Sequence, residues 1–133
     1  MNAPALRQLV PPKRILVAED EPLVAHTVRM TLTVDGHSVE VAQDGEQALA
    51  LFRAGRHDLV ITDFKMTKMD GLELAELIKR ISPTTPVILI TAYLETIKSS
   101  MGKVSNVDVL LGKPFSVMEM HAALLKVFPP GGG

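Results

Sequence analysis

Several side chains suited to metal and phosphate chemistry stand directly after apolar runs of strand length. They are the acid pair Glu19 and Asp20, the single acid Asp63, the hydroxyl of Thr91 and the ammonium of Lys113. Parallel strands of an α/β sheet end at one common edge, and ligands bind there. We therefore expect these side chains to meet at that edge. Carboxylates, a hydroxyl and an ammonium together form a site for a hard cation and a phosphoryl group.

The carboxylates predict a bound divalent cation. Carboxylates about 4 Å apart repel each other by roughly 4 kcal/mol per pair at an effective dielectric constant of about 20. The ligands would all be oxygen atoms and the chain has no Cys, so the preferred cation is Mg²⁺. Taken alone, Glu19 and Asp20 would more often be a solvated helix entrance. Asp63 alone could equally form a turn, but the joint pattern favours the cation site.

Lys113 and Thr91 fit the handling of a phosphoryl group. Most lysines are surface charges and a hydroxyl that ends a strand is commonly structural, so neither residue is informative alone. Beside a cation and Asp63, a fixed ammonium can compensate the charge on a phosphoryl oxygen, and a hydroxyl can donate a hydrogen bond to it. Phosphoryl transfer needs little from a protein beyond such positioning and electrostatics. Asp63 would then be the nucleophile that forms an acyl phosphate.

The composition indicates one globular domain. The chain has 133 residues, 47% of them hydrophobic, and a formal net charge of −1. That charge gives no electrostatic case for nucleic acid or an acidic membrane as a partner. The N-terminal region lacks the apolar core of a signal peptide, and no apolar run is long enough to span a membrane. We expect a cytoplasmic protein with a flexible arm over 1–12, a folded domain over 13–128 and a flexible tail over 129–133.

Apolar runs alternate with stretches of helical periodicity along the domain. Strands are expected at 15–18, 38–42, 59–62, 87–90 and 107–111. Helices are expected from Pro22, after Asp44 as N-cap, from Gly71 to before Pro83, around Ile97, Met101 and Val104, and after the capping box of Ser116 and Glu119. Five β–α units at this spacing predict an α/β fold with a parallel sheet, helices on both faces and right-handed crossovers.

The remaining polar residues give weaker signals. The histidines lack the spacing of metal ligands and do not adjoin the strand-end residues, so we expect surface or helix-packing roles for them. They are His26, His37, His57 and His121. Four basic residues are typical of solvated helix ends, namely Arg53, Arg56, Lys79 and Arg80. The chain has no GxxxxGK and no GxGxxG pattern, so nucleotide binding lacks support.

The chain resembles the receiver domain of two-component response regulators. The resemblance runs from about residue 14 to 128 and is carried by segments 15–22, 63–71, 91–92 and 113–115. Each segment is common alone, but the ordered set at strand ends is specific. The resemblance implies a flavodoxin-like, doubly wound sheet of five parallel strands in the order 2-1-3-4-5, with five helices.

The resemblance also implies a phosphorelay switch. A histidine kinase or a histidine phosphotransfer protein would supply the phosphoryl group to Asp63, and Thr91 and Lys113 would grip the phosphoryl oxygens. The domain would catalyse only its own phosphorylation and dephosphorylation. It would respond by changing its binding surface toward a downstream protein target, with a phosphorylation-dependent dimer as a further expectation.

Mg²⁺ is the cofactor that the resemblance implies. It would be bound by Asp20, Asp63 and the backbone carbonyl of Lys65, with Glu19 acting through water. The Lys113–Pro114 peptide bond would be cis, as is usual in the family.

Three positions depart from the family pattern. Thr67 stands where a Pro usually follows the Met of the loop after the phosphoacceptor, so that loop would be less rigid. Leu110 replaces the Tyr or Phe of the usual switch position, and residues 106–107 are Asn-Val in place of a pair of small residues. The phosphorylation chemistry is therefore expected to be intact, while the route to the output surface differs.

Two other classes of protein fit the sequence less well. An aspartyl-phosphate phosphatase for small molecules needs a second acid two residues after its nucleophile, and that position is Lys65. A degenerate receiver that serves only as a binding module would lack the acid pair, Asp63 or Lys113, and all are present. Since no effector domain follows in this sequence, we expect output by protein contact or through a partner domain that lies outside it.

Overall fold

The computed structural model describes residues 10–101 and 106–130, with the backbone alone at 100 and 101. Strands and helices alternate in the order β1 (Arg14–Ala18), α2 (Pro22–Val34), β2 (Ser38–Ala42), α3 (Gly45–Ala54), β3 (Leu59–Asp63), α4 (Gly71–Ile81), β4 (Val87–Thr91), α5 (Leu94–Met101), β5 (Val109–Gly112) and α6 (Val117–Val127). The strands form one parallel sheet in the order β2-β1-β3-β4-β5. The predicted strand order and the five helices are thus confirmed.

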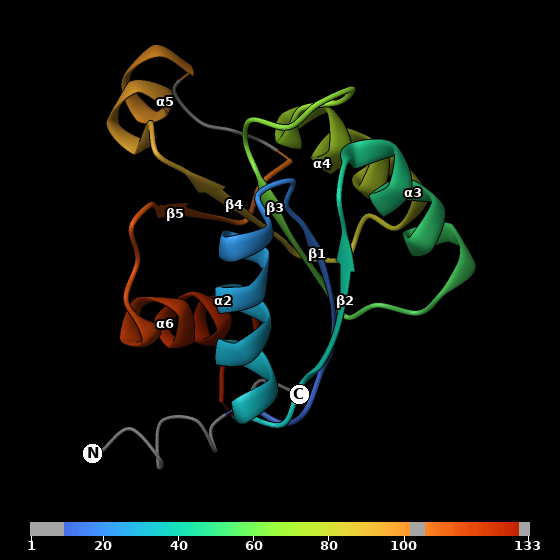
Figure 1. Cartoon of the computed structure of the whole chain (residues 1–133), viewed down its shortest axis with the longest axis vertical. Coiled ribbons are helices and arrows are strands. Elements are labelled where there is room, and N and C mark those ends of the chain that lie inside the picture. Colours follow the sequence, from blue (N-terminus) through green and yellow to red (C-terminus); the bar gives the residue numbers. More distant parts are fainter. Residues whose placement is uncertain (1–9, 102–105, 131–133) are drawn as a thin grey trace.

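Helices cover both faces of the sheet. Helices α2 and α6 pack on one face, and α3 and α4 on the other (Figure 1). Alternate residues of a strand point to opposite faces, so Ile15 and Val17 join the core under α2 and α6, while Leu16 and Ala18 join the core under α3 and α4. Because both faces are covered, the inner strands read as continuous apolar runs.

Local signals set the helix ends. Asp44 accepts a hydrogen bond from the backbone N–H of Gln47, which confirms the predicted N-cap. The capping box of Ser116 and Glu119 is likewise present. A second capping box, between Asp70 and Glu73, begins α4 and was not predicted.

The start of β5 corrects two predictions. The strand begins at Val109 rather than at 107, because the carboxylate of Asp108 accepts hydrogen bonds from the backbone N–H of Val87 and from Lys79 Nζ, at 2.8 Å each. Lys79 also donates to the carbonyl of Thr85, and its side chain is only 17% exposed. It is therefore a partly buried connection between α4 and the sheet, not a solvated helix end.

One chain segment differs from expectation, and a second agrees with it where it is described. Val10, within the predicted arm, is buried in the core beside α6, while residues 1–9 lie outside the described part. Helix α5 begins at Leu94 and buries Ile97 as predicted. The side chain of Met101 and all of Val104 lie outside the described residues.

Over the described ranges, each helix falls short of the length and apolar character that a membrane crossing requires.

Candidate functional site

Parallel pairing brings the predicted site residues to one edge of the sheet, which we call the carboxyl edge. It is formed by the ends of β1, β3, β4 and β5. Asp63 is paired with Ile90 and Thr91 with Gly112. The backbone N–H of Lys113 donates to the carbonyl of Thr91 at 2.8 Å. Residues that are far apart in the sequence therefore become neighbours because their strands end at matching register.

Lys113 connects two of the acids at this edge. Its Nζ lies 2.9 Å from Asp63 Oδ1 and 3.1 Å from Glu19 Oε1. The exposed fractions of the three side chains are 18% for Lys113, 7% for Asp63 and 3% for Glu19. The peptide bond from Lys113 to Pro114 is cis, as expected from the resemblance.

Burial and neighbouring charge shift the pKa values of this group. Burial, followed by the charge of Asp63, raises the pKa of Glu19 from 4.5 to about 7, although Lys113 and the backbone N–H of Glu21 act in the opposite direction. Burial alone would lower the pKa of Lys113, but its hydrogen bonds to Asp63 and Glu19 outweigh that effect and raise it. Asp63 and Glu19 therefore compete for the same ammonium.

Four acids gather at this edge. Carboxylate oxygens of Glu19, Asp20, Glu21 and Asp63 all lie within 4.8 Å of one another, and we call these residues the acid cluster. Its oxygen donors and its excess of negative charge over Lys113 fit a hard divalent cation such as Mg²⁺. Glu21 was not among the predicted ligands, although its place directly after the acid pair was visible in the sequence.

The loop after Asp63 is packed closely against the site. A Cβ atom on Gly71 would lie 2.2 Å from the backbone oxygen of Asp63, so only glycine fits there. Lys68 adopts a positive φ of 72°, and its Nζ lies 3.7 Å from Asp44 and 3.6 Å from Glu46. These contacts join the loop to the first turn of α3, in a loop where Thr67 replaces the family's proline.

Two further contacts lie above the strand ends. The backbone N–H of Tyr93 donates to the hydroxyl oxygen of Thr91 at 2.9 Å. Lys65 Nζ lies 5.0 Å from the ring centroid of Tyr93, within the usual range of a cation–π contact. The loop after Asp63 and the turn after Thr91 are therefore joined by side chains.

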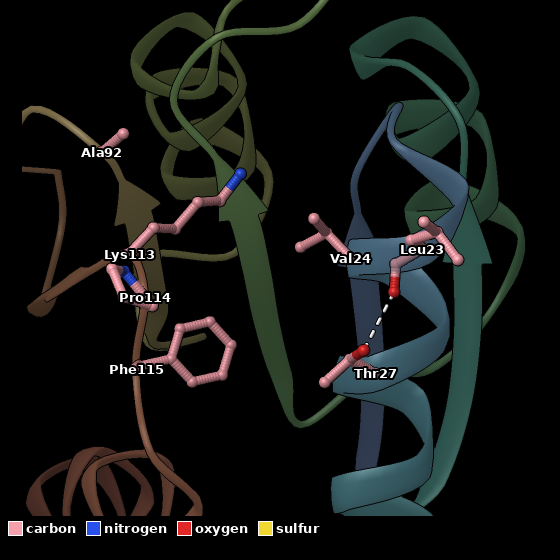
Figure 2. A pocket seen from close by; sticks show the side chains of 7 residues that line it. All are labelled: Leu23, Val24, Thr27, Ala92, Lys113, Pro114 and Phe115. Atoms are coloured by element: carbon pink, nitrogen blue, oxygen red, sulfur yellow. Dashed lines mark hydrogen bonds between the residues drawn. The ribbon is translucent and has the colours of Figure 1, made fainter.

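An apolar groove of about 480 Å³ adjoins the carboxyl edge. Figure 2 shows Val24 of α2 facing Phe115 across the groove, while Lys113, from the same wall as Phe115, extends toward the end of β3. Leu23 of α2 also lines the groove. Leu23 is 82% exposed. The groove therefore provides an accessible apolar surface next to the charged site.

Comparison with known proteins identifies the family. The model of the response regulator receiver domain matches residues 15–125, and the chain belongs to this family, whose function is phosphorylation on an aspartate in two-component signalling.

Curated relatives extend the match. The chain is 36% identical over 125 residues to the response regulator MprA of Mycolicibacterium vanbaalenii, covering 92% of this chain and 54% of that protein. It is 34% identical over 113 residues to the transcriptional regulatory protein TrcR of Mycobacterium tuberculosis, covering 85% of this chain and 44% of that protein. The chain thus spans about half the length of the curated relatives it matches.

Solved structures show the same fold. The response regulator TrrA of Thermotoga maritima, in complex with Mg²⁺ and BeF, is 34% identical with a TM-score of 0.79, covering 86% of this chain and 98% of that one. The chemotaxis response regulator CheY4 of Vibrio cholerae is 29% identical with a TM-score of 0.80, covering 88% and 99%.

Proposed function

We propose that this domain accepts a phosphoryl group from a phosphohistidine of a histidine kinase or a histidine phosphotransfer protein onto Asp63. A carboxylate oxygen of Asp63 attacks phosphorus, so an O–P bond forms as the P–N bond breaks. The imidazole nitrogen keeps the electron pair of that bond, and the ring takes up a proton. The observation that carries the proposal is the contact of Lys113 with Asp63, at 2.9 Å, inside the acid cluster.

We propose that the acid cluster binds Mg²⁺ through Asp20, Asp63 and the backbone carbonyl of Lys65, with Glu19 acting through water. When bound, the ion neutralises negative charge on the acids and on the incoming phosphoryl oxygens. Glu21, whose carboxylate belongs to the acid cluster, adds charge at the rim.

The other site residues hold the product in place. The ammonium of Lys113 would exchange its contact with Glu19 for a phosphoryl oxygen, which relieves the competition between Glu19 and Asp63. The hydroxyl of Thr91 accepts a hydrogen bond from Tyr93 and still has its own proton to donate to a second phosphoryl oxygen. Positioning and charge compensation of this kind are the main contributions of a protein to phosphoryl transfer.

Labelling with a small phosphodonor tests the acceptor. We expect the intact mass of the wild-type protein to increase by one phosphoryl group when phosphoramidate and Mg²⁺ are present, and not in the presence of EDTA. Asp63→Asn keeps the shape of the side chain and should remain unlabelled. Equal labelling of the two proteins, or labelling without a divalent cation, would refute the assignment.

The phosphodonor protein would dock beside the site. Its phosphohistidine must come into line with Asp63, so its surface must cover the rim, where the apolar groove of Leu23, Val24 and Phe115 lies. We expect Leu23→Ser to slow phosphoryl transfer from the partner kinase several-fold, while transfer from phosphoramidate is unchanged. Val34 is the matched control, because it is also an exposed apolar residue of α2 (67%) but lies at the far end of the helix. Equal effects of Leu23→Ser and Val34→Ser would exclude the groove as the docking surface.

Output by this domain is proposed to be a contact with a downstream protein, in the cytoplasm, rather than a contact with nucleic acid or a membrane. The net charge of −1 supports this view. We also propose that phosphorylation promotes dimerisation of the domain. Light scattering with and without beryllofluoride would test this dimerisation.

A further inference from the structure

The contact between Lys65 and Tyr93 lies between two loops that each carry a site residue. Lys65 follows Asp63 by two residues, and Tyr93 donates its backbone N–H to the hydroxyl of Thr91. The side chains meet with Nζ 5.0 Å from the ring centroid. A change of charge at Asp63 therefore has a short route to the aromatic ring.

The energies of the competing contacts favour a transfer of Lys65 when a phosphoryl group is present. A cation–π contact at an exposed site is a weak interaction. A phosphoryl oxygen beside Asp63 would offer the Lys65 ammonium a charge-assisted hydrogen bond, which is among the stronger hydrogen bonds in proteins. Phosphorylation should thus draw the ammonium away from Tyr93.

Tyr93 is placed to pass this change to α5. Its carbonyl accepts a hydrogen bond from the backbone N–H of Ile97 at 2.9 Å, in the first turn of that helix. The next residue, Leu94, packs on Gly112, where an added Cβ would lie 3.0 Å from Leu94 Cδ2. Tyr93 as a whole is 48% exposed. A shift of Tyr93 therefore changes both an exposed aromatic surface and the start of α5.

We propose that Lys65 and Tyr93 form a phosphorylation-released switch, in which Lys65 leaves the Tyr93 ring for the phosphoryl group and the freed ring becomes part of the output surface. The inference rests on the proposed function, because it requires a phosphoryl group on Asp63. The aromatic residue of the output surface would then be Tyr93, on the turn between β4 and α5. The usual switch position on β5 cannot supply an aromatic ring, because it is Leu110.

The chain offers a direct reporter for this switch. Tyr93 is its single Tyr and it has no Trp, so tyrosine fluorescence and the tyrosine ring signals in NMR spectra arise from this residue alone. Beryllofluoride with Mg²⁺ serves as the phosphoryl mimic, and ¹⁹F NMR on the same samples reports whether it is bound.

The variants separate the cation from other causes. In wild type and in Lys65→Arg, which keeps a cation, bound beryllofluoride should shift the Tyr93 ring signals and change its fluorescence. In Lys65→Met the ring signals of the free protein should already lie near those of the liganded wild type, and most of the ligand-induced shift should be lost. Lys13→Met, which removes a cation from the Phe128 ring instead, should behave as wild type.

The outcomes distinguish this inference from the proposed function. A bound ¹⁹F signal with no change at Tyr93, or with the same change in wild type and Lys65→Met, overturns the switch and leaves the phosphoacceptor site standing. Absence of a bound ¹⁹F signal in wild type overturns both.

Discussion

The two edges of the sheet both bury titratable side chains, but they balance them differently. At the edge where the strands begin, which we call the amino edge, Asp35 pairs with His121 Nε2, and the two side chains are 3% and 5% exposed. His37 is also buried, and its Nδ1 accepts the backbone N–H of Lys13 at 3.0 Å. At the carboxyl edge, four acids converge and Lys113 contacts two of them.

This difference separates a structural role from a ligand site. The amino edge joins α2, the start of β2 and α6 through one-to-one contacts, Asp35 with His121 and Lys13 with His37, although His121 Nδ1 has no hydrogen-bond partner among the described residues. This agrees with the helix-packing role expected for His121. The carboxyl edge holds more acids than its ammonium contact can balance. Burial, together with the charge of Asp63, raises the pKa of Glu19 to about 7. Burial of a titratable group is therefore not informative by itself, whereas an unbalanced buried charge indicates a missing partner.

A glycine substitution at each edge should produce the largest contrast. The Cβ of Gly71→Ala would lie 2.2 Å from the backbone oxygen of Asp63, so α4 must move, and we expect the free energy of unfolding to fall by more than about 3 kcal/mol. Gly36 has a φ of +91°, and its nearest neighbour would be 3.9 Å from the new Cβ. Gly36→Ala therefore adds backbone strain alone, about 1–2 kcal/mol. Urea unfolding measures both, and equal losses would contradict the close packing at Gly71.

Removing the basic partner at each edge should give unequal losses. His121→Ala leaves the buried carboxylate of Asp35 without its imidazole, and we expect a loss of about 3 kcal/mol in the free energy of unfolding. Lys113→Met should cost less near pH 6, because Glu19 can then hold a proton. Mg²⁺ should stabilise Lys113→Met at least as strongly as wild type, and His121→Ala no more than wild type. His26→Ala, at an exposed histidine of α2, is the control and should change stability by less than about 0.5 kcal/mol.

The pH dependence of stability should have opposite signs at the two edges. In EDTA, the folded state keeps a proton on Glu19 that the unfolded chain loses. This stabilisation is therefore present below pH 4.5 and lost as the pH rises through about 7, amounting to roughly 2–3 kcal/mol. Burial lowers the pKa of His37 below 6.5. The unfolded chain therefore binds a proton that the folded state does not bind. As a result, the free energy of unfolding falls as the pH drops below 6.5.

Single variants should isolate each contribution. Glu19→Gln should remove the loss on the alkaline side, and His37→Asn, whose side-chain oxygen can accept the N–H of Lys13, should remove the loss on the acid side. Urea midpoints measured from pH 5 to 8 test both. A wild-type profile retained in Glu19→Gln would show that another group carries the effect.

The smallest effects concern the two cation–π contacts, one near each edge. Lys13 Nζ lies 4.4 Å from the Phe128 ring centroid, and Lys65 Nζ lies 5.0 Å from that of Tyr93. We expect Lys13→Met to lower the free energy of unfolding by about 0.5–1 kcal/mol without changing the lifetime of the phosphorylated state.

Trimming both Lys65 and Tyr93 to Ala should speed dephosphorylation several-fold, because both side chains obstruct the attacking water. A tenfold change in rate corresponds to about 1.4 kcal/mol of activation free energy. Phosphate release at the wild-type rate in the double variant would remove the pair from any timing role.

Much of the fold could be predicted because strand and helix periods are local properties of the sequence. Asp63, Thr91 and Lys113 could be assigned to one site because parallel strands must end at a common edge. The start of β5 could not be predicted, since Val107 fits the apolar pattern and the cause is a distant contact between Asp108 and Lys79. For the same reason Lys79 was wrongly placed in solvent.

Around the site, the positions of residues could be predicted from the sequence, whereas the contacts between their side chains could not. Lys65 and Tyr93 each lie two residues beyond a site residue, and this spacing indicates that both lie at the rim of the site. The spacing carries no information on ring and ammonium orientation, so their direct contact could not be predicted. Close approach of Gly71 to Asp63 depends on how α4 packs, which no local pattern encodes.

The contact of Lys13 with Phe128 has a practical consequence for attaching this domain to other molecules. It brings the residue before β1 and the residue after α6 side by side, near the amino edge (Figure 1). Both ends of the fold therefore enter the molecule on the side away from Asp63. A surface linker or a fused fluorescent protein would therefore be attached on the same side of the domain at either end. A circular permutant that joins the two ends would need only a short connecting peptide.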